Sequence, residues 1–383
     1  MDILFLAHRA PFPPDRGDRI RSFNILKYLS QRARVHLVAF VDDDAVITDE
    51  HRALVDECVL IRRTKSQLRA VAEALAKQRP VSLTAFADRE FGRAVKDIVA
   101  RRRIDAVYAF SGQMAQYIPD AGPIAIMDFV DLDSAKFAAY AQDARAPMRW
   151  MMRREARLLA RYEQAVAARV SASLFVSAAE AALLPGSRAL ENGIDTVFYD
   201  PALAVPVASR HPLIVFTGQM DYRPNVDAVS WFARSVLPLI PDARFAIVGR
   251  APTAAVRALA AANVTVTGEV ADVRGWLAAA DVVVAPLQLA RGVQNKVLEA
   301  MAMARPVVAS AGAAEGVDHA GTIHIASDAR DYADRVTALI RDPSGAAALG
   351  RAAREQVIAR YGWEARLAPL NDLLGLAGAG RVG

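Results

Sequence analysis

Residues 291–309 read RGVQNKVLEAMAMARPVVA, which predicts a loop, an amphipathic helix and a buried strand in that order. Gly292 permits close approach of the backbone, and we expect the helix to start at Asn295 and Lys296. The unpaired N–H groups and the dipole of a helix N-terminus attract phosphate, and the lysine adds a positive charge. Glu299 follows one turn later, so the three polar side chains can converge on one ligand. An ordinary capped helix with a Lys–Glu pair would give the same pattern, so both interpretations stay open.

Short apolar strands alternate with helical stretches on both sides of this region, which is typical of parallel sheets covered by helices. The expected strands of the first half cover residues 3–7, 35–41, 58–61, 106–110, 123–129 and 174–177. Those of the second half cover residues 213–217, 245–248, 264–267, 282–285 and 306–309. The sequence therefore predicts an α/β protein with two Rossmann-like domains in tandem.

Turn formers and prolines separate the two halves. We expect a first domain over residues 1–204 and a second over residues 205–360. Residues 361–383 are expected to form a helix that packs back on the first domain, followed by a frayed tail.

The composition of the chain limits the classes of function that it can have. The chain has 383 residues, and 47 Lys and Arg against 42 Asp and Glu give a modest positive charge that suits an anionic ligand. No helix-turn-helix, zinc-finger or stacking-platform signature indicates a nucleic-acid partner. The single cysteine, Cys58, excludes a disulfide framework and a cysteine-rich metal site. The start of the chain carries no basic leader, so we expect a cytoplasmic protein.

Residues 145–170 read RAPMRWMMRREARLLARYEQAVAARV, a basic helix that carries Trp150 among arginines. Such a helix could lie on an anionic membrane surface. A solvated helix packed on its own domain would show the same spacing, and this interpretation carries more weight.

The carboxyl ends of parallel strands are where ligands gather in such sheets. Here they bring forward His8, the loop at residues 11–18 with Gly17, and the acidic segment after the strand at 123–129, with Asp128 and Asp131. A structural turn explains the glycine loop equally well, and an acidic loop can simply cap the next helix.

Several stretches together resemble the retaining glycosyltransferases of family four, which have the GT-B fold of two Rossmann-like domains facing across a cleft. They are ENGID at 191–195 with Phe198 and Pro201, FTGQMDYRPNVDAVSWF at 216–232, FAIVG at 245–249, VTGEVADVRGWLAAADVVVAPL at 266–287 and RGVQNKVLEAMAMARPVV at 291–308. The start, FLAHRAPFPPDRGDRIRSFNIL at 5–26, resembles more narrowly the sugar transferases associated with exopolysaccharide and PEP-CTERM/exosortase systems.

The resemblance implies that the second domain binds a nucleotide-diphosphate sugar and the first binds a saccharide acceptor, which could be lipid-linked. Glu299 matches the glutamate that accepts from the ribose hydroxyls, and Val273 falls where the family holds the base. Lys296 would neutralise the leaving diphosphate, with Arg223 near the family's usual basic residue. The remaining residues implied at the donor are Gly17, Gly218, Gly292, Val293, Gln294 and Asn295.

Two positions depart from the family. Arg291 stands where the family often has a glutamate that contacts the transferred sugar. MDFVDLDS at 127–134 lacks the histidine that the family often places there, and Asp131, or with less weight Asp128, could take over its role.

The resemblance also implies a reaction without cofactor or metal, because the nucleotide sugar is a substrate and the departing phosphate can accept the proton. The pair Asp131 and Asp133 resembles the metal-binding DxD of the other major glycosyltransferase fold, but two tandem domains argue against that assignment.

A nucleotide-sugar 2-epimerase would need clustered histidines and carboxylates that the sequence lacks. A catalytically silent GT-B subunit that binds nucleotide or partner proteins remains the alternative to an enzyme.

Overall fold

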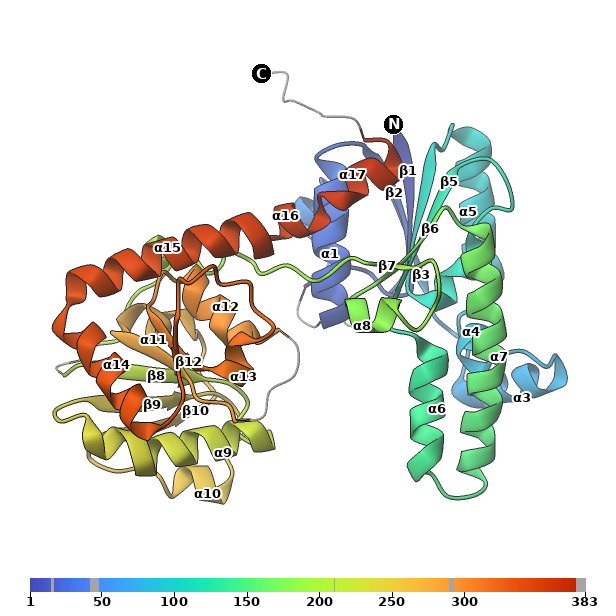
Figure 1. The fold of residues 1–383 in the computed structure, drawn as a ribbon. Helices are drawn as coiled ribbons and strands as arrows, with labels where there is room; N and C mark the ends of the chain where they lie inside the picture. Colours follow the sequence, from blue (N-terminus) through green and yellow to red (C-terminus); the bar gives the residue numbers. More distant parts are fainter. Residues whose placement is uncertain (15–16, 42–47, 210, 289–292, 377–383) are drawn as a thin grey trace, which may run out of the picture. The chain divides into compact units, whose positions relative to one another are not determined.

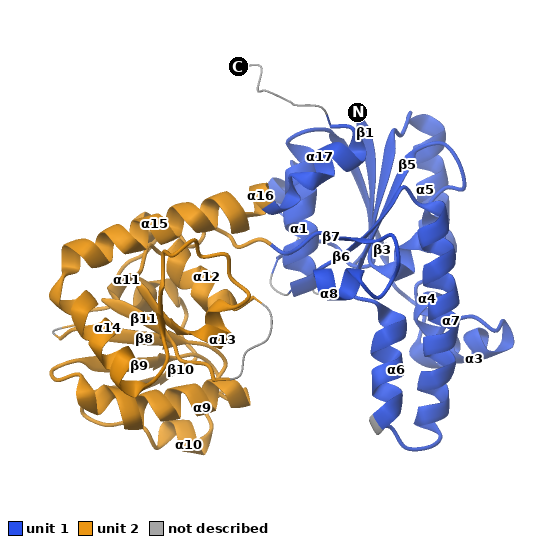
Figure 2. Ribbon diagram, viewed as in Figure 1, with its two compact units in different colours: residues 1–192, 366–383 blue, residues 193–365 orange. Residues whose placement is uncertain are grey.

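The computed structural model describes residues 1–14, 17–41, 48–209, 211–288 and 293–376, and it divides into two compact units. Unit 1 comprises Met1–Asn192 and Arg366–Gly383, and unit 2 comprises Gly193–Ala365 (Figure 2). Each unit has its own parallel sheet flanked by helices (Figure 1), so the predicted α/β architecture of two Rossmann-like units is confirmed.

Unit 1 contains a seven-stranded sheet in the order β3-β2-β1-β4-β5-β6-β7, and all its pairings are parallel. Its strands are β1 Asp2–Ala7, β2 Arg34–Val41, β3 Glu57–Arg62, β4 Ala106–Phe110, β5 Ile124–Val130, β6 Ala172–Phe175 and β7 Arg188–Ala189. Central strands such as β1 and β4 are buried throughout because helices cover both faces, which explains their unbroken apolar sequences.

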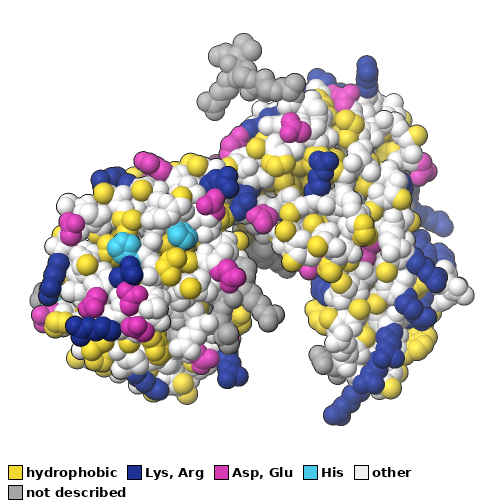
Figure 3. Space-filling view, in the orientation of Figure 1, with side chains coloured by type: hydrophobic (Ala, Val, Ile, Leu, Met, Phe, Trp, Pro, Cys, Tyr) yellow, Lys and Arg dark blue, Asp and Glu magenta, His cyan; other side chains and the backbone are white. Residues whose placement is uncertain are grey.

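The helices of unit 1 are α1 Gly17–Ser30, α2 Asp49–Arg52, α3 Gln67–Ala76, α4 Val81–Ala85, α5 Arg89–Arg101, η1 Gly112–Tyr117, α6 Asp133–Asp143, α7 Met148–Arg169, α8 Ala178–Ala181 and α17 Pro369–Leu374. The basic stretch forms α7, which packs along α6. Its inner face buries Arg154 and Glu155, whereas Trp150 and the arginines at 149, 153, 157 and 161 are exposed. Figure 3 shows Lys and Arg side chains gathered on the side of unit 1 that carries α3 and α7.

Unit 2 contains a six-stranded parallel sheet in the order β10-β9-β8-β11-β12-β13. Its strands are β8 Leu213–Thr217, β9 Arg244–Val248, β10 Val264–Gly268, β11 Val282–Ala285, β12 Val307–Ser310 and β13 His324–Ala326. Its helices are η2 Pro201–Leu203, α9 Arg223–Trp231, η3 Phe232–Val236, η4 Leu237–Leu239, α10 Ala254–Arg257, α11 Arg274–Ala279, α12 Asn295–Ala302, α13 Ala311–Ala314, α14 Ala329–Arg341 and α15 Pro343–Tyr361. The boundary between the units falls within the next helix, α16 Trp363–Leu367.

The division between the units falls after Asn192, whereas the sequence placed it after residue 204. Residues 193–204 contact unit 2 instead: Ile194 forms a parallel bridge with Gly362, and the Arg354 guanidinium donates to the carbonyl of Tyr199 at 2.8 Å. The chain then returns to unit 1 at its end, where the Tyr28 hydroxyl donates to Asn371 Oδ1 at 3.0 Å.

Candidate functional site

An open cavity of about 700 Å³ lies in unit 2. Its lining comes from the residues that follow β8, β9 and β10 and from the start of α12. Because the carboxyl ends of parallel strands meet at one edge of a sheet, these separate segments of sequence form one site. The volume is that of an ordinary small-molecule pocket.

Two glycines form one wall of the cavity and leave no room for side chains. A Cβ on Gly249, whose φ is +149°, would lie 1.7 Å from the carbonyl oxygen of Gly218. A Cβ on Gly218, whose φ is +156°, would lie 2.7 Å from Asn225 Nδ2 and 3.4 Å from Lys296 Nζ. Glycine at both positions therefore lets two loops touch and leaves room for the lysine side chain beside them.

Lys296 occupies the first turn of α12 and points its ammonium group at this wall. Its Nζ donates a hydrogen bond to Asn225 Oδ1 and lies 4.6 Å from the centroid of the Phe216 ring. Asn225 Nδ2 donates in turn to the carbonyl of Gln219 at 2.9 Å, which fixes the amide. Burial lowers the pKa of Lys296 to about 8, so the side chain is still mostly cationic at neutral pH.

Glu299 lies one turn further along α12 and also lines the cavity. Its carboxylate accepts a hydrogen bond from the Tyr199 hydroxyl. Burial raises the pKa of Glu299, and burial together with the nearby carboxylate raises the pKa of Tyr199. The site thus holds a cation and a poorly solvated acceptor group side by side, which suits a ligand that has both an anionic group and hydroxyls.

Other residues expected at the donor reach the same cavity. Val273, Val293, Gln294 and Asn295 line it with Gly218, Lys296 and Glu299. Arg291 and Gly292 lie outside the described residues.

Arg223, which we expected near the donor, is not among the described residues that line the cavity. It begins α9 with its side chain exposed, and its Nε lies 3.6 Å from Asp227 Oδ2. Asn225, two residues later, points inward instead. The cavity has a different arginine, Arg250, whose Nη2 donates to Gln219 Oε1 at 3.0 Å.

Asp128 is fully buried in unit 1, where its side chain contacts other residues of the protein. Its Oδ2 accepts from Arg21 Nη2 at 2.9 Å and from the Tyr108 hydroxyl at 2.8 Å. Asp131 is exposed, and Gly17 is exposed at the start of α1 with nothing within 4 Å of an added Cβ. Of the two aspartates, only Asp131 is accessible to a ligand.

Sequence reasoning missed several lining residues, among them Tyr199, Gln219, Asn225, Arg250 and Glu269. Asn225 gave a weak signal, since it follows a proline at a helix start, but nothing in the sequence showed that it faces Lys296. Across the described residues, no group of three His, Cys, Asp or Glu side chains could hold a metal ion. No helix in this part of the chain is long and apolar enough to cross a membrane.

Comparison with known proteins finds a family match that falls within unit 2. Residues 211–342 match the family model described as "Glycosyl transferases group 1". The chain is 32% identical over 229 residues to a GDP-mannose-dependent alpha-(1-6)-phosphatidylinositol monomannoside mannosyltransferase of Mycobacterium tuberculosis. That match covers 53% of this chain and 58% of the relative, so the chain spans little more than half the length of the curated relatives that it matches.

Solved structures share the fold over nearly the whole chain. The sucrose-phosphate synthase of Thermosynechococcus elongatus has a TM-score of 0.58 at 20% identity, and covers 97% of this chain and 98% of its own. Anabaena Alr3699/HepE in complex with UDP has a TM-score of 0.59 at 16% identity, with 98% and 100% covered. A glycosyltransferase from Rickettsia africae has a TM-score of 0.61 at 14% identity, with 97% of each chain covered. These likenesses show the GT-B fold.

Proposed function

Because residues 211–342 match the group 1 glycosyltransferases, we propose that this chain moves a sugar from a nucleotide-diphosphate sugar to a saccharide acceptor. The observation that carries the proposal is the cavity of unit 2, where Lys296, the N-terminus of α12 and Glu299 converge. A diphosphate needs positive charge and N–H donors, and a ribose needs a carboxylate. The cavity offers both within two turns of one helix.

In this proposal the donor lies along the start of α12. Lys296 and the backbone N–H groups after Val293 bind the diphosphate, while Glu299 accepts hydrogen bonds from the ribose hydroxyls. Asn225 and Tyr199 position these two side chains through the hydrogen bonds they already make. Val273 borders the base, and Arg291 is the position that would distinguish donor choice from that of related enzymes.

We further propose a retaining, metal-independent transfer. The bond between the anomeric carbon and the phosphate oxygen breaks while the acceptor hydroxyl adds to the same face, and the departing phosphate oxygen takes the acceptor proton. Lys296 stabilises the charge that develops on that phosphate, which is the largest contribution the protein can make to such a step. Alignment of donor and acceptor supplies the rest.

Unit 1 would bind the acceptor, a saccharide or lipid-linked saccharide of exopolysaccharide synthesis, with Asp131 as the accessible carboxylate in place of a histidine. The exposed outer face of α7, with Trp150 and its row of arginines, supports peripheral contact with an anionic membrane on the cytoplasmic side. Arg154 takes no part in such contact, because it is buried and donates to the carbonyl of Ala74 at 2.8 Å.

Turnover of a panel of UDP-, GDP- and dTDP-sugars with a lipid-linked acceptor extract tests the proposal. The proposal predicts release of nucleoside diphosphate from at least one donor, and a loss of about 100-fold or more in Lys296→Ala and Glu299→Ala without unfolding. Nucleotide binding with no turnover of any donor would instead indicate the catalytically silent subunit. Full activity in both variants would remove the site assignment.

Membrane contact has its own test in vesicles that contain phosphatidylglycerol. Replacing Arg149, Arg153 and Arg157 by glutamine should release the chain from the vesicles, whereas unchanged binding would exclude this face of α7.

A further inference from the structure

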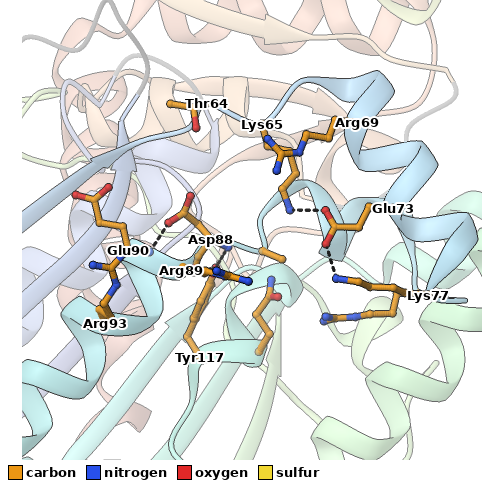
Figure 4. A pocket seen from close by; sticks show the side chains of 13 residues that line it. Thr64, Lys65, Arg69, Glu73, Lys77, Asp88, Arg89, Glu90, Arg93 and Tyr117 are labelled. Atoms are coloured by element: carbon orange, nitrogen blue, oxygen red, sulfur yellow. Dashed lines mark hydrogen bonds and ion pairs between the residues drawn. The ribbon is translucent and has the colours of Figure 1, made fainter.

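A second large cavity, of about 750 Å³, lies in unit 1. Its lining comes from residues after β3, from α3 and the residues just after it, from the end of η1 and from the start of α5. Figure 4 shows Lys65, Arg69, Glu73 and Lys77 along one side of it and Arg89 on the other. Six cationic side chains line the cavity: Lys65, Arg69, Lys77, Arg79, Arg89 and Arg93. Three carboxylates, Glu73, Asp88 and Glu90, oppose them, which leaves an excess of three positive charges.

Two of the three carboxylates already have partners. Glu73 accepts hydrogen bonds from Lys65 at 3.1 Å and Lys77 at 2.8 Å, and these contacts lower its pKa to about 2. Asp88 Oδ1 accepts from the backbone N–H groups of Glu90 and Phe91 at the start of α5. Both carboxylates are therefore already bound by neighbouring groups of the protein.

The four arginines are the open groups of this cavity. The guanidinium groups of Arg69, Arg79, Arg89 and Arg93 make no hydrogen bond or ion pair with any residue that the structure describes. An excess of positive charge in one concavity favours an anionic ligand, and a guanidinium binds carboxylate or phosphate with two parallel hydrogen bonds.

The other residues of the lining favour a saccharide over a nucleic acid as the ligand. Glu90 and Thr64 line the cavity among the cations and can bind hydroxyls. The one aromatic ring, that of Tyr117, lies 4.4 Å from the Phe91 ring, and its hydroxyl accepts from the N–H of Asp88 at 2.7 Å. No aromatic face is thus left for stacking on a nucleic-acid base among the described lining residues.

We propose that this cavity binds an acidic saccharide. The carboxylate or phosphate groups of the saccharide pair with the arginines, and its hydroxyls bind the side chains of Glu90 and Thr64. We assign this saccharide to the acceptor of the transfer, and this assignment rests on the proposed function, in which unit 1 binds the acceptor. The acceptor of the transfer would then carry negative charge.

Isothermal titration of the full chain with tetragalacturonate tests the inference, with neutral maltotetraose and inorganic pyrophosphate as separate arms. Arg89→Gln/Arg93→Gln removes two exposed, unpaired charges of the cavity. Arg234→Gln/Arg351→Gln removes two exposed arginines of unit 2 and is the matched control. The cavity variant should weaken tetragalacturonate binding tenfold or more, the control should stay within twofold, and maltotetraose should not bind.

Three outcomes would overturn the inference. Equal weakening in both variants would show unspecific attraction of a polyanion. Pyrophosphate binding as tightly as tetragalacturonate would show a phosphate site without a role for the sugar. Binding of phosphatidylglycerol vesicles but no saccharide would show a lipid headgroup site. Nucleotide titration of the same variants reports on unit 2 alone, so a failure of the donor proposal is seen independently.

Discussion

Lys296 has the property that best separates a binding site from an ordinary capped helix. Its ammonium group is half-buried, is held by Asn225 and has a pKa lowered to about 8. Below this pH the free protein would present a cation to the proposed diphosphate ligand, and above it the lysine is mostly neutral before any ligand binds.

Nucleoside diphosphate binding should therefore weaken as pH rises from 7 to 9.5. A group with its pKa at about 8 is mostly protonated at the lower pH and mostly neutral at the higher one, so we expect roughly a tenfold increase in Kd. Lys296→Arg, whose guanidinium stays charged, should flatten the profile. A wild-type Kd that does not change over this range would contradict the role of the lysine.

Glu299 should govern recognition of the ribose. Glu299→Gln should reduce the preference for UDP or GDP over the 2′,3′-dideoxy nucleotide by about tenfold, because a neutral amide accepts hydrogen bonds less strongly than a carboxylate. Tyr199→Phe should change this preference less, since Tyr199 contacts the carboxylate and not the ribose. Competition binding measures both ratios, and equal ratios in wild type and Glu299→Gln would exclude the assignment.

At the scale of elements, the end of β5 is held in an unusual shape by a buried ion pair. Val130 has φ of +70°, an uncommon value for a β-branched residue, and its N–H donates to Asp128 Oδ1 at 3.1 Å. Asp128 is bound in turn by Arg21 from α1. This network shapes the strand end from which Asp131 projects.

Asp128→Asn should lower the free energy of unfolding by about 3 kcal/mol, because it leaves the buried Arg21 guanidinium without its counter-charge. Asp131→Asn, at an exposed position, should leave stability unchanged. Urea unfolding followed by circular dichroism measures both. Equal stability of the two variants would show that the pair contributes nothing to the fold.

Gly249→Ala should lower the free energy of unfolding by about 2 kcal/mol or more, since the added Cβ would clash with the backbone of Gly218. Gly17→Ala, where an added Cβ meets nothing within 4 Å, is the matched control. Thermal unfolding gives the comparison, and a neutral Gly249→Ala would mean that the two loops are not in close contact.

The sequence predicted the strands well and the site in part. Unbroken apolar runs located nearly all the strands, but β7 and β13, of two and three residues, are too short to show a pattern. Lys296 and Glu299 were found because they share one helix. Tyr199, Asn225 and Arg250 come from other segments, and only the folded sheet edge brings them to α12. The sequence did not show that Asp128 is buried, because its partner Arg21 lies 107 residues earlier in the chain.

At the scale of the whole molecule, each unit has its own core. The cluster around β8 and α12 draws all its buried residues from unit 2, and the cluster around β4 and β5 draws all of its own from unit 1. The described residues that line the proposed donor cavity all belong to unit 2. Donor binding and transfer should therefore be separable.

A fragment of residues 193–365 should fold and bind nucleoside diphosphate with a Kd within about threefold of the full chain, yet transfer no sugar, since the proposed acceptor unit is missing. Titration and turnover assays on the purified fragment check this. A folded fragment that does not bind nucleotide would show that the donor site needs residues of unit 1.

A crystal structure of the full chain with a bound nucleotide-diphosphate sugar tests the assignment of Lys296 and Glu299 to the donor most directly. We expect diphosphate oxygens about 3 Å from Lys296 Nζ and from backbone N–H groups of the first turn of α12, with the ribose hydroxyls on Glu299. A nucleotide bound elsewhere, or bound in the cavity without contact to either side chain, would contradict it.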